Sequence, residues 1–324
     1  FYKDVHLLKR GDPSQKQEKM SQGFLRVLTS RDKNELHWQQ VKPEWARTSF
    51  RRRSLADWLV DTEHGAGHLL ARVIVNRLWQ HHLGRGIVAT PSDFGLQGEM
   101  PTHPELLDWL AGELINNGWR LKPLHKKIIM SATYAQSAEF AQAKAAVDPE
   151  NRLHWRRTPR RLEAEPIRDS LLAVSGLLDT TMFGKGTLDP EMKRRSVYFQ
   201  IKRSKLIPTM QLFDSPEPLV GQGTRPSTII SPQALLFMNN RQVREASLTL
   251  ASRYEFDSVE NAVKNGYESV VGRSPTPAEQ QATTRFIESQ ELSYFKSGSK
   301  DGRKLALADF AQVLFGLNEF VYVY

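Results

Sequence analysis

The sequence predicts a mainly α-helical protein: a multi-helix globular bundle with an irregular insert that is rich in Gly, Pro and Arg and contains a short strand. Apolar residues recur at helical spacing on both sides of the insert. Several of these stretches carry helix-starting prolines and helix-stopping Asn-Gly or Gly residues. Glycine and proline punctuate residues 181–230, which indicates turns and loops there.

The pattern along the chain suggests two regions. Residues 1–50 are polar, basic and irregular, and we expect an extended linker or approach segment. Residues 51–324 form the predicted helical domain, with halves at about 51–180 and 230–324 that share one core across the insert 181–230. A chain of 324 residues is long enough to bury such a core.

The first half contains five predicted helices. In residues 54–59 and 69–83 the apolar side chains fall at i, i+3 and i+4. Pro104 is expected in the first turn of a helix that ends at Asn117-Gly118. The last two helices span about 123–135 and 162–178, and the second of them begins with acidic residues that complement the helix dipole.

The insert contains one predicted strand, at residues 196–201. Helices are expected again at about 232–254, 257–271, 277–295 and 301–316. The C-terminal FVYVY is short and apolar, and we expect it to pack back onto the body as a strand or extended tail.

The composition excludes several kinds of site. Without cysteine there can be no disulfide, thiolate zinc site, iron–sulfur cluster, cysteine nucleophile or covalent c-type haem. No P-loop, dinucleotide-binding, nucleophile-elbow or zinc-protease motif is present. No apolar stretch approaches the roughly 18 residues of a membrane helix. We therefore expect no cofactor in this chain and no membrane span.

The net charge of +9 is concentrated in one segment: residues 151–210 hold 13 basic and 6 acidic residues. This segment is predicted to be either a docking face for an anionic partner or a set of arginines paired internally with Glu163, Glu165, Asp169 and Asp214. Nucleic acid is not an expected partner, because no zinc finger, RNP-like strand or GXXG loop is present. The candidate binding residues are Arg77, Arg160, Arg161, Arg168, Arg194, Arg195, Arg203 and Arg225.

The candidate catalytic carboxylates are Glu163, Glu165 and Asp169. Glu165 and Asp169 are four residues apart, so they share one helix face and could form an acid/base pair or bind a hard cation. Arg168 lies beside them, so the alternative is a buried ion network, which we favour.

Histidines provide the other candidates. His82 is predicted to point towards the apolar stripe of its helix, where it could transfer protons or bind a metal. Weak metal or haem candidates are His81, His82 and His103. The favoured alternative is a structural histidine that donates to a backbone carbonyl beside Trp79.

An ordered series of motifs carries a family resemblance. The motifs are SLADWL (54–59), ARVIVNRLWQHHLGRGIVATPSDFGLQG (71–98), PTHPELLDWLA (101–111), GWRLKPLHKKIIMSATYAQS (118–137), DPENRL (148–153), RRLEAEPIRD (160–169), RRSVYFQIKRS (194–204) and SPQALLFMNN (231–240). Together they resemble the planctomycete PSD1 domain family, the domain of unknown function 1553, and LLKRGDP (7–13) is similar to the linker that precedes it. One departure is Phe183-Gly184-Lys185-Gly186, where relatives carry a Gly-Gly-Pro-like turn.

The resemblance implies an exported protein, periplasmic or at the cell surface, with a cytochrome-like domain upstream of the helical module. No targeting leader is visible before Phe1, and we expect the chain to be part of a longer polypeptide. Our leading hypothesis is a non-haem module of a cytochrome-associated assembly. Its basic face would dock a haem-bearing domain or partner chain, or an acidic polysaccharide. The alternative is an enzyme of polysaccharide degradation, hydrolytic or redox, with a carboxylate and histidine site.

Overall fold

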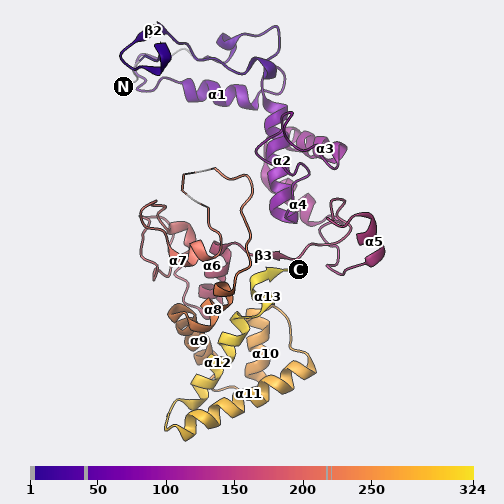
Figure 1. Ribbon diagram of the computed structural model, residues 1–324, viewed down its shortest axis with the longest axis vertical. Helices are drawn as coiled ribbons and strands as arrows, with labels where there is room; N and C mark the ends of the chain where they lie inside the picture. Colours follow the sequence, from indigo (N-terminus) through magenta and orange to yellow (C-terminus); the bar gives the residue numbers. More distant parts are fainter. Residues whose placement is uncertain (1–3, 40–42, 217, 220) are drawn as a thin grey trace. The chain divides into compact units, whose positions relative to one another are not determined.

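The computed structural model describes residues 4–39, 43–216, 218–219 and 221–324. In these residues it contains 13 α-helices and two small two-stranded sheets, so the prediction of a mainly α-helical fold is confirmed (Figure 1). The chain divides into two compact units, residues 1–136 with 141–155, and residues 137–140 with 156–324. None of the helices in the described residues combines the length and hydropathy that a membrane span requires.

The N-terminal part of the first unit is held by a small aromatic cluster. Trp38 and Trp58 are buried there and pack with Phe24, whose ring stacks on Trp58 at 5.2 Å between centroids. Both indole N–H groups are satisfied: Trp38 donates to Asp61 (2.9 Å) and Trp58 donates to Thr29 (3.1 Å). The elements of this part are β1 (His6–Leu8), β2 (Lys16–Lys19) and α1 (Arg51–Val60).

The rest of the first unit is a helical cluster. Its helices are α2 (Gly67–Leu83), α3 (Pro104–Asn116), α4 (Leu121–Ile129) and α5 (Gln142–Val147). The apolar faces of α2, α3 and α4 meet in one core, in which Trp79, Leu114 and Leu124 are buried. After α2 the chain turns at Gly84, whose φ of +91° favours glycine. The buried Asn76 amide then holds the returning loop by two hydrogen bonds to the backbone of Val88, at 2.8 and 2.9 Å.

The second unit surrounds the buried helix α12 (Gly302–Phe315). Leu307, Leu314 and Phe315 of this helix are almost inaccessible to solvent. The other elements of the unit are β3 (Arg160–Arg161), α6 (Ala164–Ser175), α7 (Pro208–Leu212), α8 (Ser231–Asn239), α9 (Arg241–Tyr254), α10 (Val259–Val270), α11 (Pro277–Lys296), α13 (Asn318–Val321) and β4 (Tyr322–Val323). Strand β4 pairs antiparallel with β3, which confirms the prediction for the C-terminal tail.

Several elements differ from the sequence-based expectation. The helix predicted at 232–254 is broken at Asn240 into α8 and α9, and α5, α7 and α13 were not predicted. Helix α6 packs through Ile167 and Leu171 into the same core as α9 and α12, so the division of the chain falls at residues 155/156 instead of near 180. The strand predicted at 196–201 is a 3-10 turn, Ser196–Tyr198, followed by a single β-bridge between Phe199 and Thr187. Ser196 of this segment bonds to Arg168 and Asp169 of α6, and the backbones of Tyr198 and Gln200 bond to Thr187.

Candidate functional site

The first turn of α6 presents the two predicted catalytic glutamates to one arginine. Glu163 is the residue before the helix and Glu165 lies in its first turn, where a carboxylate is favoured by the helix dipole. Arg225 Nη1 lies 2.7 Å from Glu165 Oε2 and 3.1 Å from Glu163 Oε2. Burial alone would lower the pKa of Arg225, but its hydrogen bond to Glu165 and the two negative charges outweigh this effect and raise it. Both glutamates are therefore in ion pairs.

Asp169, one turn further along α6, anchors the insert. Its Oδ1 accepts hydrogen bonds from the backbone N–H and the hydroxyl of Ser196, both at 2.7 Å. Arg168 and Arg195 each approach the same carboxylate to 3.6 Å. The predicted acid is thus shared between a buried serine and two cations.

Arg168 is buried beneath the insert. Its guanidinium donates to the carbonyl of Arg194 (3.0 Å), to Ser196 Oγ (3.3 Å) and to the carbonyl of Met192. It also lies 4.6 Å from the centre of the Phe199 ring. Burial lowers the pKa of Arg168, and the charge of Asp169 opposes that shift. With only 4% of its side chain exposed, Arg168 holds the insert on α6 and is not at the surface.

Arg161 is the second buried arginine. It donates to Asp214 Oδ2 at 2.5 Å, and its guanidinium carbon lies 5.4 Å from the centre of the Phe213 ring. Asp214 has a φ of +61° and also accepts from the backbone and hydroxyl of Thr228, both at 2.8 Å. Within the described part of the chain, Nε and Nη1 of Arg161 have no hydrogen-bond partner. Arg160, its neighbour in β3, is exposed.

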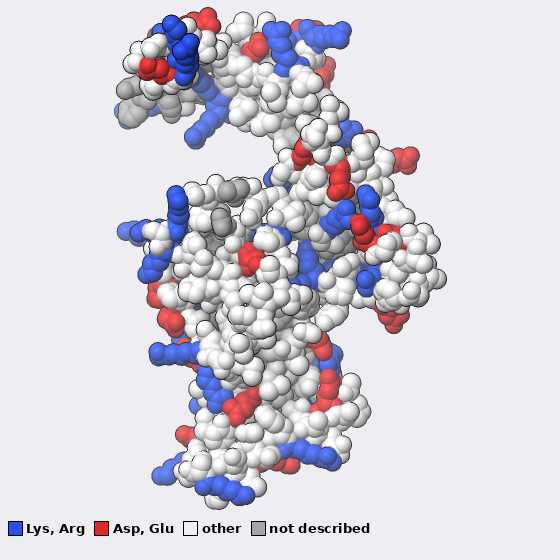
Figure 2. All heavy atoms as spheres, in the orientation of Figure 1, with Lys and Arg blue, Asp and Glu red and all other residues white. Residues whose placement is uncertain are grey.

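The remaining predicted cations differ in exposure. Arg194 is partly buried over the ring of Tyr198, whereas Arg195 keeps 66% of its side chain exposed and Arg203 is also exposed. Lys and Arg side chains gather on the side of the second unit where the loop before α7 lies (Figure 2). Arg77 is exposed on α2, in the first unit.

The predicted histidines lie in the first unit and do not form a metal cluster. His82 Nε2 and His125 Nδ1 are 2.8 Å apart, His81 is exposed, and His103 Nδ1 lies 2.9 Å from Thr102 Oγ1. His154, which sequence reasoning missed, accepts from the indole N–H of Trp79 at 3.3 Å, and burial lowers its pKa. In the described ranges no three His, Asp or Glu side chains come together in a group that could hold a metal ion.

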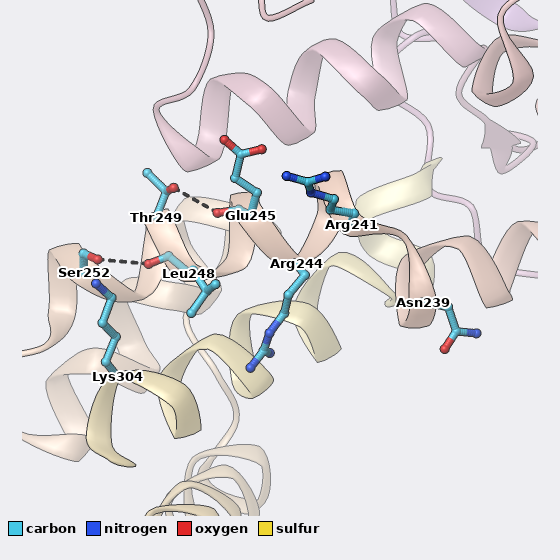
Figure 3. A pocket seen from close by; sticks show the side chains of 8 residues that line it. All are labelled: Asn239, Arg241, Arg244, Glu245, Leu248, Thr249, Ser252 and Lys304. Carbon is cyan, nitrogen blue, oxygen red and sulfur yellow. Dashed lines mark hydrogen bonds between the residues drawn. The ribbon is translucent and has the colours of Figure 1, made fainter. Parts of the chain in front are cut away.

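A pocket that the sequence did not predict lies along α9. Figure 3 shows its lining from α9, the end of α8 and α12, and its volume is about 590 Å³. Arg244 forms an ion pair with Asp309 (2.7 Å). The hydroxyls of Thr249 and Ser252 donate to the backbone carbonyls of the residues one turn earlier in α9. No predicted site residue lines this pocket, so the carboxylates of α6 do not open into it. The lining residues are Asn239, Arg241, Arg244, Glu245, Leu248, Thr249, Ser252 and Lys304.

The family model PSD1, described as a protein of unknown function (DUF1553), matches residues 51–287, well over half of the chain. The chain belongs to the PSD1 family. No curated protein and no solved structure matches it. The matched region begins at the first residue of α1 and ends within α11, so it contains the α6 ion pairs and the whole insert of this PSD1 chain.

Sequence reasoning thus named the charged residues around α6 of this PSD1 domain and offered internal pairing with carboxylates as one alternative, but it did not assign each arginine its partner. Asp214 was expected as an internal partner of the arginines and pairs with Arg161, whereas Ser196, a partner of the buried Arg168, was not predicted. Asp214 lies within the turn-rich insert, where Asp tolerates a positive φ. The arrangement favours an ion network over an acid/base pair, because an arginine beside a carboxylate favours its charged form while a general acid must carry a proton.

Proposed function

We propose that this PSD1 domain is a docking module that binds an anionic macromolecule through a cationic loop, defined as Lys185, Lys202, Arg203 and Lys205. All four side chains are exposed, and among the described residues none of them forms a salt bridge. This observation carries the proposal. Arg161, Arg168 and Arg225, by contrast, are paired inside the second unit.

The positive charges of the cationic loop favour the docking of an anionic partner by electrostatic attraction. Uncompensated cations raise the local concentration of an anionic partner and speed its association. The partner we propose belongs to the exported, cytochrome-associated assembly that the resemblance implies, at the periplasmic or cell-surface side. It is either the acidic face of a haem-bearing domain or an acidic polysaccharide. This domain would supply no haem of its own.

The test is a charge-matched pair of triple variants. The first is Lys202→Gln/Arg203→Gln/Lys205→Gln in the cationic loop. The second is Lys264→Gln/Arg285→Gln/Lys300→Gln, which also removes two lysines and one arginine, but from exposed positions elsewhere in the same unit. Binding to heparin and to carrageenan is measured at physiological salt.

We expect the loop variant to bind each polyanion roughly tenfold or more weakly than the wild type, and its affinity to depend less on salt concentration. The matched variant should change little in both respects. Equal losses in both variants would mean that only net charge matters, and the docking loop would be rejected. No binding of the wild-type chain to either polyanion would also end the proposal.

A second candidate function is polysaccharide hydrolysis at Glu163 and Glu165. The observation that favours it is that Glu163 and Glu165 keep 46% and 33% of their side chains exposed, so that a carboxylate kept charged by Arg225 is available as a nucleophile or base. Release of reducing ends from carrageenan by the wild type, abolished in Glu165→Gln, would establish it. No release by the wild type would remove it.

A further inference from the structure

Phe183 is an exposed aromatic side chain on a strained turn. Its φ is +67°, in the left-handed region that non-glycine residues rarely adopt, and the following Gly184 has a φ of +84°. The side chain is 77% exposed, so burial of the ring does not explain the conformation. Such a conformation is unfavourable for a non-glycine residue and persists only when the surrounding structure holds it.

Two side chains hold both peptide groups of Phe183. Its N–H donates to Tyr198 Oη at 2.7 Å, and its carbonyl accepts from Arg194 Nη2. The Arg194 guanidinium is itself fixed, 3.5 Å from the centre of the Tyr198 ring and with Nε donating to the carbonyl of Thr181 at 3.0 Å. The ring of Phe183 is therefore presented to solvent by a rigid frame.

The same frame joins the turn to the cationic loop. Thr187 donates to the carbonyl of Tyr198 (3.0 Å) and accepts from the backbone of Gln200 (2.8 Å). A Cβ at Gly186 would lie 2.9 Å from the Tyr198 carbonyl oxygen, so only glycine permits this approach. Lys185 thus lies two residues before Thr187, and Lys202 lies two residues after Gln200.

We infer that Phe183 is a stacking platform for a sugar ring, and that the ligand of the cationic loop is an acidic polysaccharide. The inference rests on the proposed docking function and names its partner. One flat apolar ring among exposed cations matches a polymer in which apolar sugar faces alternate with carboxylates or sulfates. Stacking on an aromatic ring removes apolar surface of both groups from water. The core of a protein interface, in contrast, is depleted of charged residues.

The test compares two carboxylate polymers that differ in having sugar rings: alginate oligosaccharides and poly-L-glutamate. The variants are Phe183→Ala, Phe183→Trp and the control Phe256→Ala, which removes a 94% exposed ring from another loop. Far-UV circular dichroism verifies that each variant is folded. Alanine at position 183 would adopt the same positive φ at a similar cost as phenylalanine, so Phe183→Ala is expected to retain the turn.

We expect Phe183→Ala to weaken alginate binding about tenfold with poly-L-glutamate binding unchanged, Phe183→Trp to retain it, and Phe256→Ala to have no effect. Unchanged alginate binding in Phe183→Ala would overturn the inference while leaving the docking loop intact. An equal loss for both polymers would overturn it in favour of a protein partner. Failure of the wild type to bind either polymer would instead reject the proposed docking function.

Discussion

Asp169 and Ser196 form a two-point contact: one carboxylate oxygen accepts both the backbone N–H and the hydroxyl of the serine, each at 2.7 Å. The serine is buried, and Asp169 keeps 18% of its side chain exposed. The contact joins α6 to a segment 27 positions later. The spacing of Glu165 and Asp169 on the helix made Asp169 a catalytic candidate. In the structure its carboxylate holds the insert against α6.

Replacing Asp169 tests this structural role. Asp169→Ala leaves two Ser196 donors without their partner and removes the carboxylate nearest to the buried Arg168. We expect a loss of about 2 kcal/mol in the free energy of unfolding. The measurement is urea unfolding followed by far-UV circular dichroism. Glu288→Gln, at an exposed position of α11, should change the free energy by less than about 0.5 kcal/mol, and an equal loss there would contradict the explanation.

Arg168 should be the more costly residue to replace. Arg168→Met removes the donor to the carbonyls of Met192 and Arg194 and leaves Asp169 without its buried cation. We expect a loss of about 3 kcal/mol or more, since breaking a buried charge network strands its other members. Arg195→Met, with 66% of the arginine exposed, removes the neighbouring cation at little cost. If both substitutions have similar effects on unfolding, burial of Arg168 is not what matters.

Replacing two helical glycines by alanine should change the free energy of unfolding in opposite directions. A Cβ at Gly266 of α10 would lie 2.7 Å from the buried Phe310 ring, so Gly266→Ala should destabilise the second unit by about 1–3 kcal/mol. A Cβ at Gly112 of α3 meets nothing within 4 Å, and Gly112→Ala should stabilise the first unit by up to about 1 kcal/mol. All 7 tryptophans lie at or before Trp155, so their emission follows the first unit, whereas circular dichroism follows both. A destabilising Gly112→Ala would refute the assignment of open space there.

Acid should weaken the second unit through Arg273. This arginine binds Glu279 by two hydrogen bonds of 2.8 Å and Glu319 by bonds of 2.6 and 2.8 Å. The hydrogen bond from Arg273 lowers the pKa of Glu279 from 4.5 to about 2, with a further contribution from the backbone of Thr276. Because the folded state lowers this pKa, its stabilisation is complete above pH 4.5 and is lost as the pH falls towards 2.

Comparison with Glu279→Gln checks this prediction. The difference in unfolding free energy between the wild type and the variant should be largest near neutral pH and should shrink between pH 4.5 and 2. Unfolding of both proteins is followed in urea at several pH values. A difference that stays constant over this range would mean that the charge of Glu279 does not contribute.

The sequence by itself determined most of the longer helices of this PSD1 domain, and for a local reason, but not the break at Asn240 between α8 and α9 or the short helices α5, α7 and α13. Apolar spacing, an initial proline or a terminal glycine act within a few turns of one helix. Pro104 and Gly84 mark ends of α3 and α2, and the apolar tail after Leu317 contains the strand β4. The charge excess of residues 151–210 was equally visible in the sequence.

Only the tertiary structure decided which charged side chains are paired inside the protein and which remain exposed at the surface. Arg161, Arg168 and Arg225 find partners 24 to 60 positions away, and composition cannot select among the many Asp, Glu and carbonyl groups available at such separations. The same long-range frame turns Phe183 outward by fixing both of its peptide groups. Local propensity sets where helices form, but long-range hydrogen bonds and burial decide which side chains are available to a partner.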